Sequence, residues 1–78
     1  MSAKEMFKEL GFELEEQTDT FIVYACYEDD DTCYVCFELN EHYFQCFYNP
    51  EYTMYSQPLE VNMQLQNAIN KQIEELEW

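Results

Sequence analysis

The chain has very little positive charge. It contains three Lys and no Arg against seventeen Asp and Glu, which gives a formal net charge of −14 at pH 7. A protein that binds DNA or RNA directly needs cations that displace the counterions of the phosphates, and an anionic membrane surface likewise attracts basic segments. Direct binding to nucleic acid or to a membrane is therefore excluded. The charge favours a basic protein as partner, although charge of one sign also serves solubility alone.

Glycine and proline are also scarce, with one Gly and two Pro in 78 residues, whereas aromatic residues make up 18% of the chain. This composition is typical of a globular domain and excludes a disordered segment. No apolar run approaches the roughly 20 residues of a membrane-spanning helix. The first ten residues lack the basic-then-apolar pattern of a signal peptide. We therefore expect one cytoplasmic domain over residues 1–78.

Both ends of the chain carry helix signals. Ser2 and Glu5 have the spacing of a capping box, and apolar residues then recur every three to four positions up to Gly11, which favours a left-handed helix end. These features predict a helix over about residues 3–10. Asn62 is a suitable N-cap for a second helix over residues 63–76. The apolar stripe of this second helix is formed by Val61, Leu65, Ala68, Ile69, Ile73 and Leu76.

The residues between the helices are rich in aromatic and β-branched side chains, which predicts strands. We expect an edge strand over residues 12–16, three stronger strands over 20–28, 32–39 and 42–48, and a possible fifth over 51–56. The predicted fold class is α+β: an N-terminal helix, an antiparallel β-meander of four to five strands, and a C-terminal helix packed on one sheet face.

The register of the first hairpin decides which sheet face is buried. If Asp29 to Asp31 form a three-residue turn, all the residue pairs on one face of this hairpin are apolar. Both helices are then expected on the face that carries Phe21, Val23, Val35, Phe37 and Phe44. The opposite face carries Ile22, Tyr24, Cys26, Tyr34, Cys36, Tyr43 and Phe47. The alternative is that one helix covers each face.

Four cysteines, two of them in a Cys-x-x-Cys pair, raise the question of a metal or redox site. In the predicted register Cys33 and Cys46 lie on the core face and Cys26 and Cys36 on the other, because residues three apart in a strand point to opposite sides. Zinc needs four convergent ligands, and a thioredoxin-type pair needs a helix N-terminus. We expect no metal and no cofactor, and thiols that stay free in a reducing cytosol.

Candidates for catalysis are few. His42 is the only histidine, so a nucleophile has a single imidazole available as its base. The carboxylates of residues 28–31 lack the spaced ligands and the turn glycine of a calcium-binding EF-hand loop. No carboxylate pair is flanked by the residues that usually shape a pocket. The sequence predicts that the protein is not an enzyme.

Two sets of residues are candidates for binding a partner. The acidic set, which imitates the phosphates of nucleic acid, consists of Glu13, Glu15, Glu16, Glu28, Asp29, Asp30, Asp31 and Glu41. The aromatic set, which marks an exposed sheet face for a partner or a second copy, consists of Tyr24, Tyr34, Tyr43 and Phe47.

The two ends of the chain also resemble a known group of proteins. SAKEMFKELGFE at the start and LQNAINKQIEELEW at the end are similar to the AKEMFEELGY and AINKQIEELGW helices of that group. Its members are small, mostly uncharacterised proteins of Gram-positive bacteria, their phages and prophages. The resemblance follows the whole chain in order and length and is specific at the two ends. Glu77 stands where the group usually has Gly, which leaves open the turn before Trp78, and the cysteines are not part of the pattern.

The resemblance implies a phage or mobile-element origin and a role in host takeover or anti-defence, but it supplies no activity. Two functions follow as expectations. The first is a non-enzymatic acidic protein that inhibits or redirects a basic host nucleic-acid-binding protein by nucleic-acid mimicry. The second is a self-associating scaffold, such as a homodimer, that uses the aromatic face. The sequence does not identify the host protein.

Overall fold

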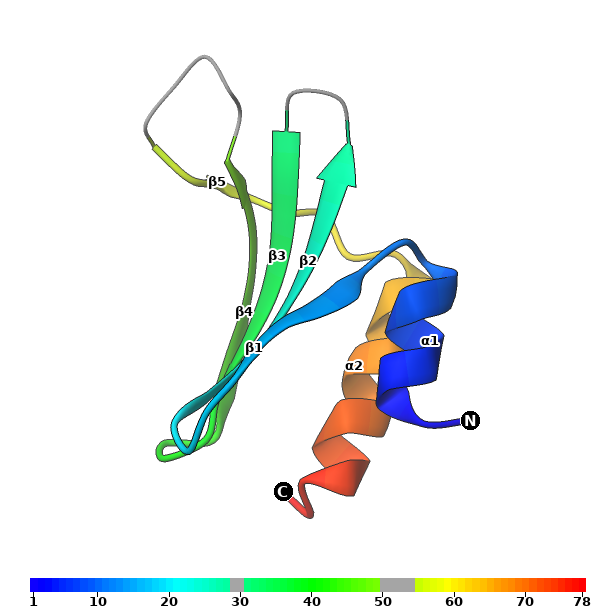
Figure 1. Cartoon of the computed structure of the whole chain (residues 1–78), viewed down its shortest axis with the longest axis vertical. Coiled ribbons are helices and arrows are strands. Elements are labelled where there is room, and N and C mark those ends of the chain that lie inside the picture. Colours follow the sequence, from blue (N-terminus) through cyan, green and yellow to red (C-terminus); the bar gives the residue numbers. More distant parts are fainter. Residues whose placement is uncertain (29–30, 50–54) are drawn as a thin grey trace.

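A computed structural model of the chain describes residues 1–28, 31–49 and 55–78. The elements are α1 (Ala3–Glu9), β1 (Glu13–Gln17), β2 (Phe21–Glu28), β3 (Asp31–Glu38), β4 (Tyr43–Asn49), β5 (Gln57–Pro58) and α2 (Met63–Glu75). The five strands form one antiparallel sheet in the order β1-β2-β3-β4-β5, and both helices lie side by side on one face of it (Figure 1). The predicted α+β meander, with its C-terminal helix on one sheet face, is confirmed.

The fifth strand differs from the prediction over residues 51–56. Residues 50–54 lie outside the described part of the chain, and Tyr55 and Ser56 are not in a strand. The short β5 instead pairs Gln57 with Tyr48 and Pro58 with Phe47. Neither described helix is long and apolar enough to cross a membrane.

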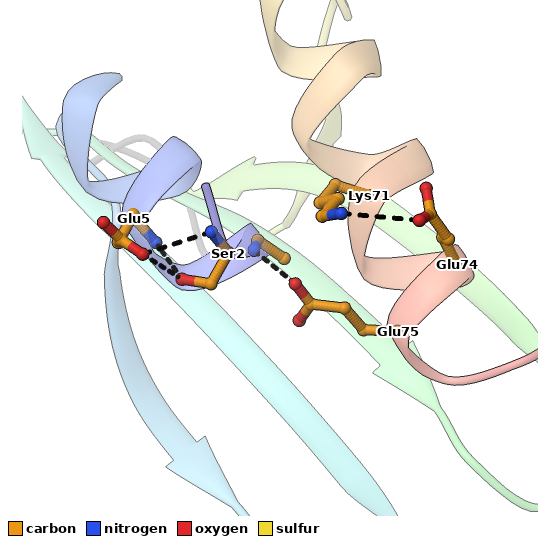
Figure 2. Close-up of polar contacts among 6 residues, drawn as sticks. Ser2, Glu5, Lys71, Glu74 and Glu75 are labelled. Carbon is orange, nitrogen blue, oxygen red and sulfur yellow. Dashed lines mark hydrogen bonds and ion pairs between the residues drawn. The ribbon is translucent and has the colours of Figure 1, made fainter.

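The ends of α1 are built as the sequence predicts. Ser2 Oγ accepts a hydrogen bond from the Glu5 backbone N–H at 3.1 Å, and Glu5 Oε1 accepts one from the Ser2 N–H at 3.1 Å (Figure 2). The Ser2 N–H and the Ser2 hydroxyl both donate to Glu5 Oε1, and these two bonds lower the pKa of the Glu5 carboxyl. Gly11 takes a left-handed φ of 90°, and the Phe12 N–H donates to the Phe7 carbonyl at 2.9 Å. Helix α1 thus has satisfied groups at both ends.

The two helices are joined where α1 begins and α2 ends. Glu75 Oε2 accepts a hydrogen bond from the Ala3 N–H at 2.8 Å (Figure 2). A carboxylate at the C-terminus of its own helix is unfavourable, but here it lies at the positive N-terminus of α1. The bond therefore offsets part of the dipole penalty that the acidic end of α2 carries.

The end of α2 adopts the same turn as the end of α1, but without a glycine. The Trp78 N–H donates to the Ile73 carbonyl at 3.2 Å, and the Glu77 N–H to the Glu74 carbonyl at 3.1 Å. Glu77 takes a left-handed φ of 60°, which costs a residue with a Cβ about 1–2 kcal/mol. Trp78 then stacks on His42, with ring centroids 4.9 Å apart, and closes the end of the core beside Phe37.

Glu77→Gly is therefore expected to raise the free energy of unfolding by about 0.5–1.5 kcal/mol, because it removes the left-handed strain and one carboxylate from the helix C-terminus. Urea unfolding followed by circular dichroism measures the change. Glu77→Gln is the control, since it removes the charge and keeps the Cβ. An equal gain in both variants would show that the charge, not the backbone, is the cause.

The core lies between the helices and one sheet face. Phe7 of α1 stacks on Tyr24 of β2 with ring centroids 4.0 Å apart, and Phe37 of β3 meets both rings edge-on. The other buried members of this cluster are Ala3, Phe12, Ile22, Cys26, Val35, Leu65, Ala68 and Ile69. The expected presence of Val35 and Phe37 on the core face is confirmed.

The predicted register of the first hairpin is wrong by one residue. Glu28 pairs with Asp31, so the turn has two residues, and Tyr24 lies opposite Val35 and Ile22 opposite Phe37. Phe21 and Val23 therefore leave the core face, and Ile22, Tyr24 and Cys26 join it. Both faces of β2 are apolar, so alternation alone does not select the register, and the two-residue turn, which is common in hairpins, decides it. The second hairpin has the predicted pairs Val35 with Cys46 and Phe37 with Phe44.

A buried polar pair links the sheet to α2. The Tyr24 hydroxyl donates to Gln72 Oε1 at 2.7 Å, and both side chains are buried. Burial, followed by the carboxylate of Glu75, raises the pKa of Tyr24 to about 12. The unfolded phenol ionises near its ordinary value of about 10, so between about pH 10 and 12 the unfolded chain binds fewer protons than the folded one. Stability from this group is complete below that range and falls as the pH rises through it.

We expect Tyr24→Phe to cost about 1–3 kcal/mol at pH 9, because it leaves the buried Gln72 oxygen without its donor. At about pH 11.5 the difference between the variant and the wild type is expected to shrink or reverse, since only the wild type must keep a buried phenol neutral. Urea titrations of both proteins at the two pH values test this. A cost that is the same at both would contradict it.

Candidate binding surface

The sheet face opposite the helices is named here the open face, because no helix or strand of the described residues packs on it (Figure 1). Antiparallel sheets commonly have one solvated face, but that face is then usually polar. Here it combines apolar, aromatic and acidic side chains. By register it is formed by Glu13, Glu16, Phe21, Val23, Ala25, Tyr27, Thr32, Tyr34, Cys36, Glu38, Tyr43, Gln45, Phe47 and Asn49. Ala25 and Glu38 are buried within this face.

One side of the open face is a row of carboxylates on β1, named the acidic edge, formed by Glu13, Glu15 and Glu16. Glu13 lies opposite Ala25 and Glu16 opposite Val23, with a bulge between Leu14 and Glu16 that adds Glu15 to the edge. At about 3.3 Å per residue, these three carboxylates span roughly 10 Å. The average separation of neighbouring carboxylates is therefore about 5 Å, wider than the roughly 3.4 Å per charge along one strand of a DNA duplex but of the same order.

Three rings that cross the sheet from the strand next to the acidic edge are named the aromatic row: Tyr27 of β2, Tyr34 of β3 and Phe47 of β4. Tyr34 and Phe47 are cross-strand partners and stack, with centroids 5.2 Å apart and planes inclined by 27°. Tyr27 is a diagonal neighbour of Tyr34 and is 61% exposed. A hydrogen bond with Glu15 is the first cause that raises the pKa of Tyr27. The aromatic row and the acidic edge are therefore one continuous surface.

The remaining open-face aromatics lie near the opposite end of the sheet. Phe21 and Tyr43 flank Glu38, and they are 40% and 44% exposed. Glu38 is only 9% exposed, and its carboxylate accepts a hydrogen bond from the Glu41 N–H. Glu38 therefore holds the β3–β4 turn and presents little charge to a partner.

The predicted acidic set does not share one face. Glu28 and Asp31 lie at one end of β3, on the side of Cys33, whose pKa they raise after burial. Glu41 is in the turn after β3, about 23 Å or more from Asp31 at ~3.3 Å per residue. Asp29 and Asp30 lie outside the described residues. The structure therefore brings together the acidic edge alone from this set.

The predicted aromatic set is divided in the same way. Tyr34, Tyr43 and Phe47 lie on the open face, whereas Tyr24 is in the core, so its prediction as an exposed residue is wrong. Sequence reasoning missed Tyr27, because the predicted register turned it toward the core. The pairing of Glu28 with Asp31 is what places Tyr27 and Val23 on the open face.

The cysteines follow the corrected register. Cys26 lies directly opposite Cys33 on the helix-covered face, which also holds Cys46, and Cys36 is on the open face. The predicted separation of Cys33 from Cys36 is confirmed, but Cys26 is not on the face predicted for it. All four are free. Among the described residues, no group of three His, Cys, Asp or Glu is arranged to hold a metal ion.

A hollow of about 190 Å³ beside Cys26 and Cys33 is the site with most chemistry-bearing side chains on the helix-covered side, and Glu28, Glu60 and Asn62 also line it. Burial is the main cause that raises the pKa of both thiols, and the carboxylate of Glu28 raises them further. Raised pKa values keep thiols protonated near pH 7, and the thiol is a poor nucleophile and a poor metal ligand. The hollow therefore offers no activated group.

Comparison with protein-family models, curated proteins and solved structures finds no match to this chain.

Proposed function

We propose that the protein is a non-enzymatic, phage- or mobile-element-encoded binding protein of the cytoplasm, which inhibits or redirects a basic host protein that handles nucleic acid. It acts by occupying the nucleic-acid site of that protein in a stoichiometric complex. The observation that carries this proposal is the separation of charge between the two layers. Residues 11–62, the part of the sequence that contains all five described strands, have twelve of the seventeen Asp and Glu and no Lys or Arg.

The three lysines support this reading by their position. Lys4 and Lys8 belong to α1 and Lys71 to α2, so all of them are on the helical layer. Lys71 pairs with Glu74 at 3.4 Å on the surface (Figure 2). Lys4 and Lys8 line one hollow with Glu13 at the start of β1, so these cations lie near that end of the acidic edge. Glu15 and Glu16 are exposed and have no lysine on their own layer, which leaves their field directed toward a cationic partner.

The experiment is capture from a lysate of a Gram-positive bacterium on the immobilised protein at about 0.05 M salt, followed by elution at about 0.5 M, where charges are screened over a much shorter distance. We expect basic nucleic-acid-binding proteins in the eluate. Beads that carry a protein of similar size and charge are the control. Recovery of non-basic proteins only, or of none, would refute the proposal.

A self-associating scaffold is the second candidate, because the open face exposes aromatic side chains that no described helix covers. Size-exclusion chromatography with light scattering distinguishes the two. A dimer that persists from low to high salt supports the scaffold, whereas a monomer that binds its partner less tightly as salt rises supports the mimic.

A further inference from the structure

Among the described residues of the open face, the aromatic row crosses the sheet from β2 to β4 and meets the acidic edge at its β1 end, where Glu13 lies opposite Ala25 and Ala25 opposite Tyr34. At its other end, β4 (Tyr43–Asn49) and β5 (Gln57–Pro58) contain no charged residue. A duplex presents two rows of phosphates, one on each side of a groove, and its base faces are stacked inside. A single strand presents one row of phosphates beside bases that are free to stack. Within the described residues, the open face has carboxylates at one border of its rings, which matches the second arrangement better than the first.

The apolar part of the surface selects among basic partners. Burying Tyr27, Tyr34 and Phe47 against a site that holds cations alone would strip water from those cations and return only cation–π contacts, while most of the ring surface would have no apolar counterpart. Grooves that bind single strands combine cations with aromatic side chains on which bases stack. Such a groove offers ring faces to the aromatic row and cations to the acidic edge.

A second copy of this chain is a less favourable partner for the open face than a cationic groove. Two open faces packed together would bring both acidic edges into or beside one interface, and residues 11–62, which contain all five described strands, supply no lysine or arginine to either edge. Unpaired carboxylates in a closed interface are costly. Charge complementarity therefore favours a cationic groove over a homodimer.

We propose that the open face docks in the single-strand-binding groove of a basic protein, with the acidic edge in place of the phosphates and the aromatic row in place of stacked bases. The inference rests on the proposed function and names its partner class: proteins that bind single-stranded rather than double-stranded nucleic acid.

Competition tests this choice. The immobilised protein is incubated with a bacterial lysate and washed. The captured proteins are then challenged either with oligo(dT) of about 30 nucleotides or with a duplex of the same length. This length exceeds the roughly 4–16 nucleotides that one OB fold contacts. We expect release by oligo(dT) at a concentration at least about tenfold lower than by duplex. Release by the duplex at an equal or lower concentration overturns the inference and leaves the proposed function intact. Capture of no basic protein, or of a second copy only, overturns both.

Two charge variants locate the surface. Glu13→Gln with Glu15→Gln and Glu16→Gln is expected to weaken capture about tenfold, since three interface charges are lost. Glu9→Gln with Glu74→Gln and Glu77→Gln changes the net charge equally on exposed positions outside the open face, and is expected to weaken capture less than about threefold. Equal losses would show that net charge alone drives binding and would overturn the docking face.

An aromatic variant separates stacking from apolar burial. Tyr34→Leu with Phe47→Leu keeps an apolar surface but removes the stacked pair, and circular dichroism verifies that it folds. Capture is expected to fall at least about fivefold, because each ring that stacks contributes on the scale of one base. Single replacements at the same positions serve if the double variant unfolds. Folded variants that bind like the wild type would overturn the role of the aromatic row.

Discussion

Phe37→Ala is expected to lower the free energy of unfolding by about 3–5 kcal/mol, a large part of the roughly 4–12 kcal/mol typical for a domain of this size. Phe37 is fully buried in the centre of the sheet. Its ring contacts those of Phe7, Tyr24, Phe44 and Trp78, so its loss opens a cavity between α1, strands β2 to β4 and the residue that follows α2 at the C-terminal end. Urea unfolding followed by fluorescence of Trp78 and by circular dichroism measures the change.

Phe21→Ala is the matched control, because it removes the same side chain from the open face. Phe21 is 40% exposed, and its loss is expected to cost less than about 1 kcal/mol. If Phe21→Ala proved as costly as Phe37→Ala, the open face would be covered in solution, and the proposed binding surface would be unavailable.

Ile22→Lys is expected to unfold the protein. Ile22 is 5% exposed on the core face opposite Phe37, and an ammonium group buried there without a partner costs several kcal/mol, comparable to the whole stability of the domain. Loss of the cooperative thermal transition by circular dichroism is the expected result.

Val23→Lys, one position further along the same strand, is expected to remain folded within about 1 kcal/mol of the wild type. Val23 is on the open face opposite Glu16, so the new ammonium group reaches solvent and lies near a carboxylate. Because the two positions are consecutive, their side chains point to opposite faces. A folded Ile22→Lys together with an unfolded Val23→Lys would mean that Val23 faces the core and Ile22 faces solvent, the opposite of the arrangement described.

The sequence determined the elements of the fold because their signals are local. The Ser2–Glu5 capping box, Gly11 at the end of α1 and the Asn62 N-cap each act within a few residues, and the structure contains all three. The meander order follows from strands joined by short turns. Even Glu77, where the resembled group usually has Gly, takes the left-handed conformation.

Only the tertiary structure decided which residues form the binding surface. β2 is apolar on both faces, so its pattern is equally compatible with Tyr24 or Tyr27 in the core. The choice comes from the two-residue turn together with the packing of Tyr24 against Phe7 and Gln72, which are 17 and 48 positions away in the chain. Likewise, no local feature of the sequence shows that Glu13 lies on the binding surface and Glu28 does not. Their positions follow from the pairing of β1 with β2 and from the helices that cover one face, which are long-range contacts.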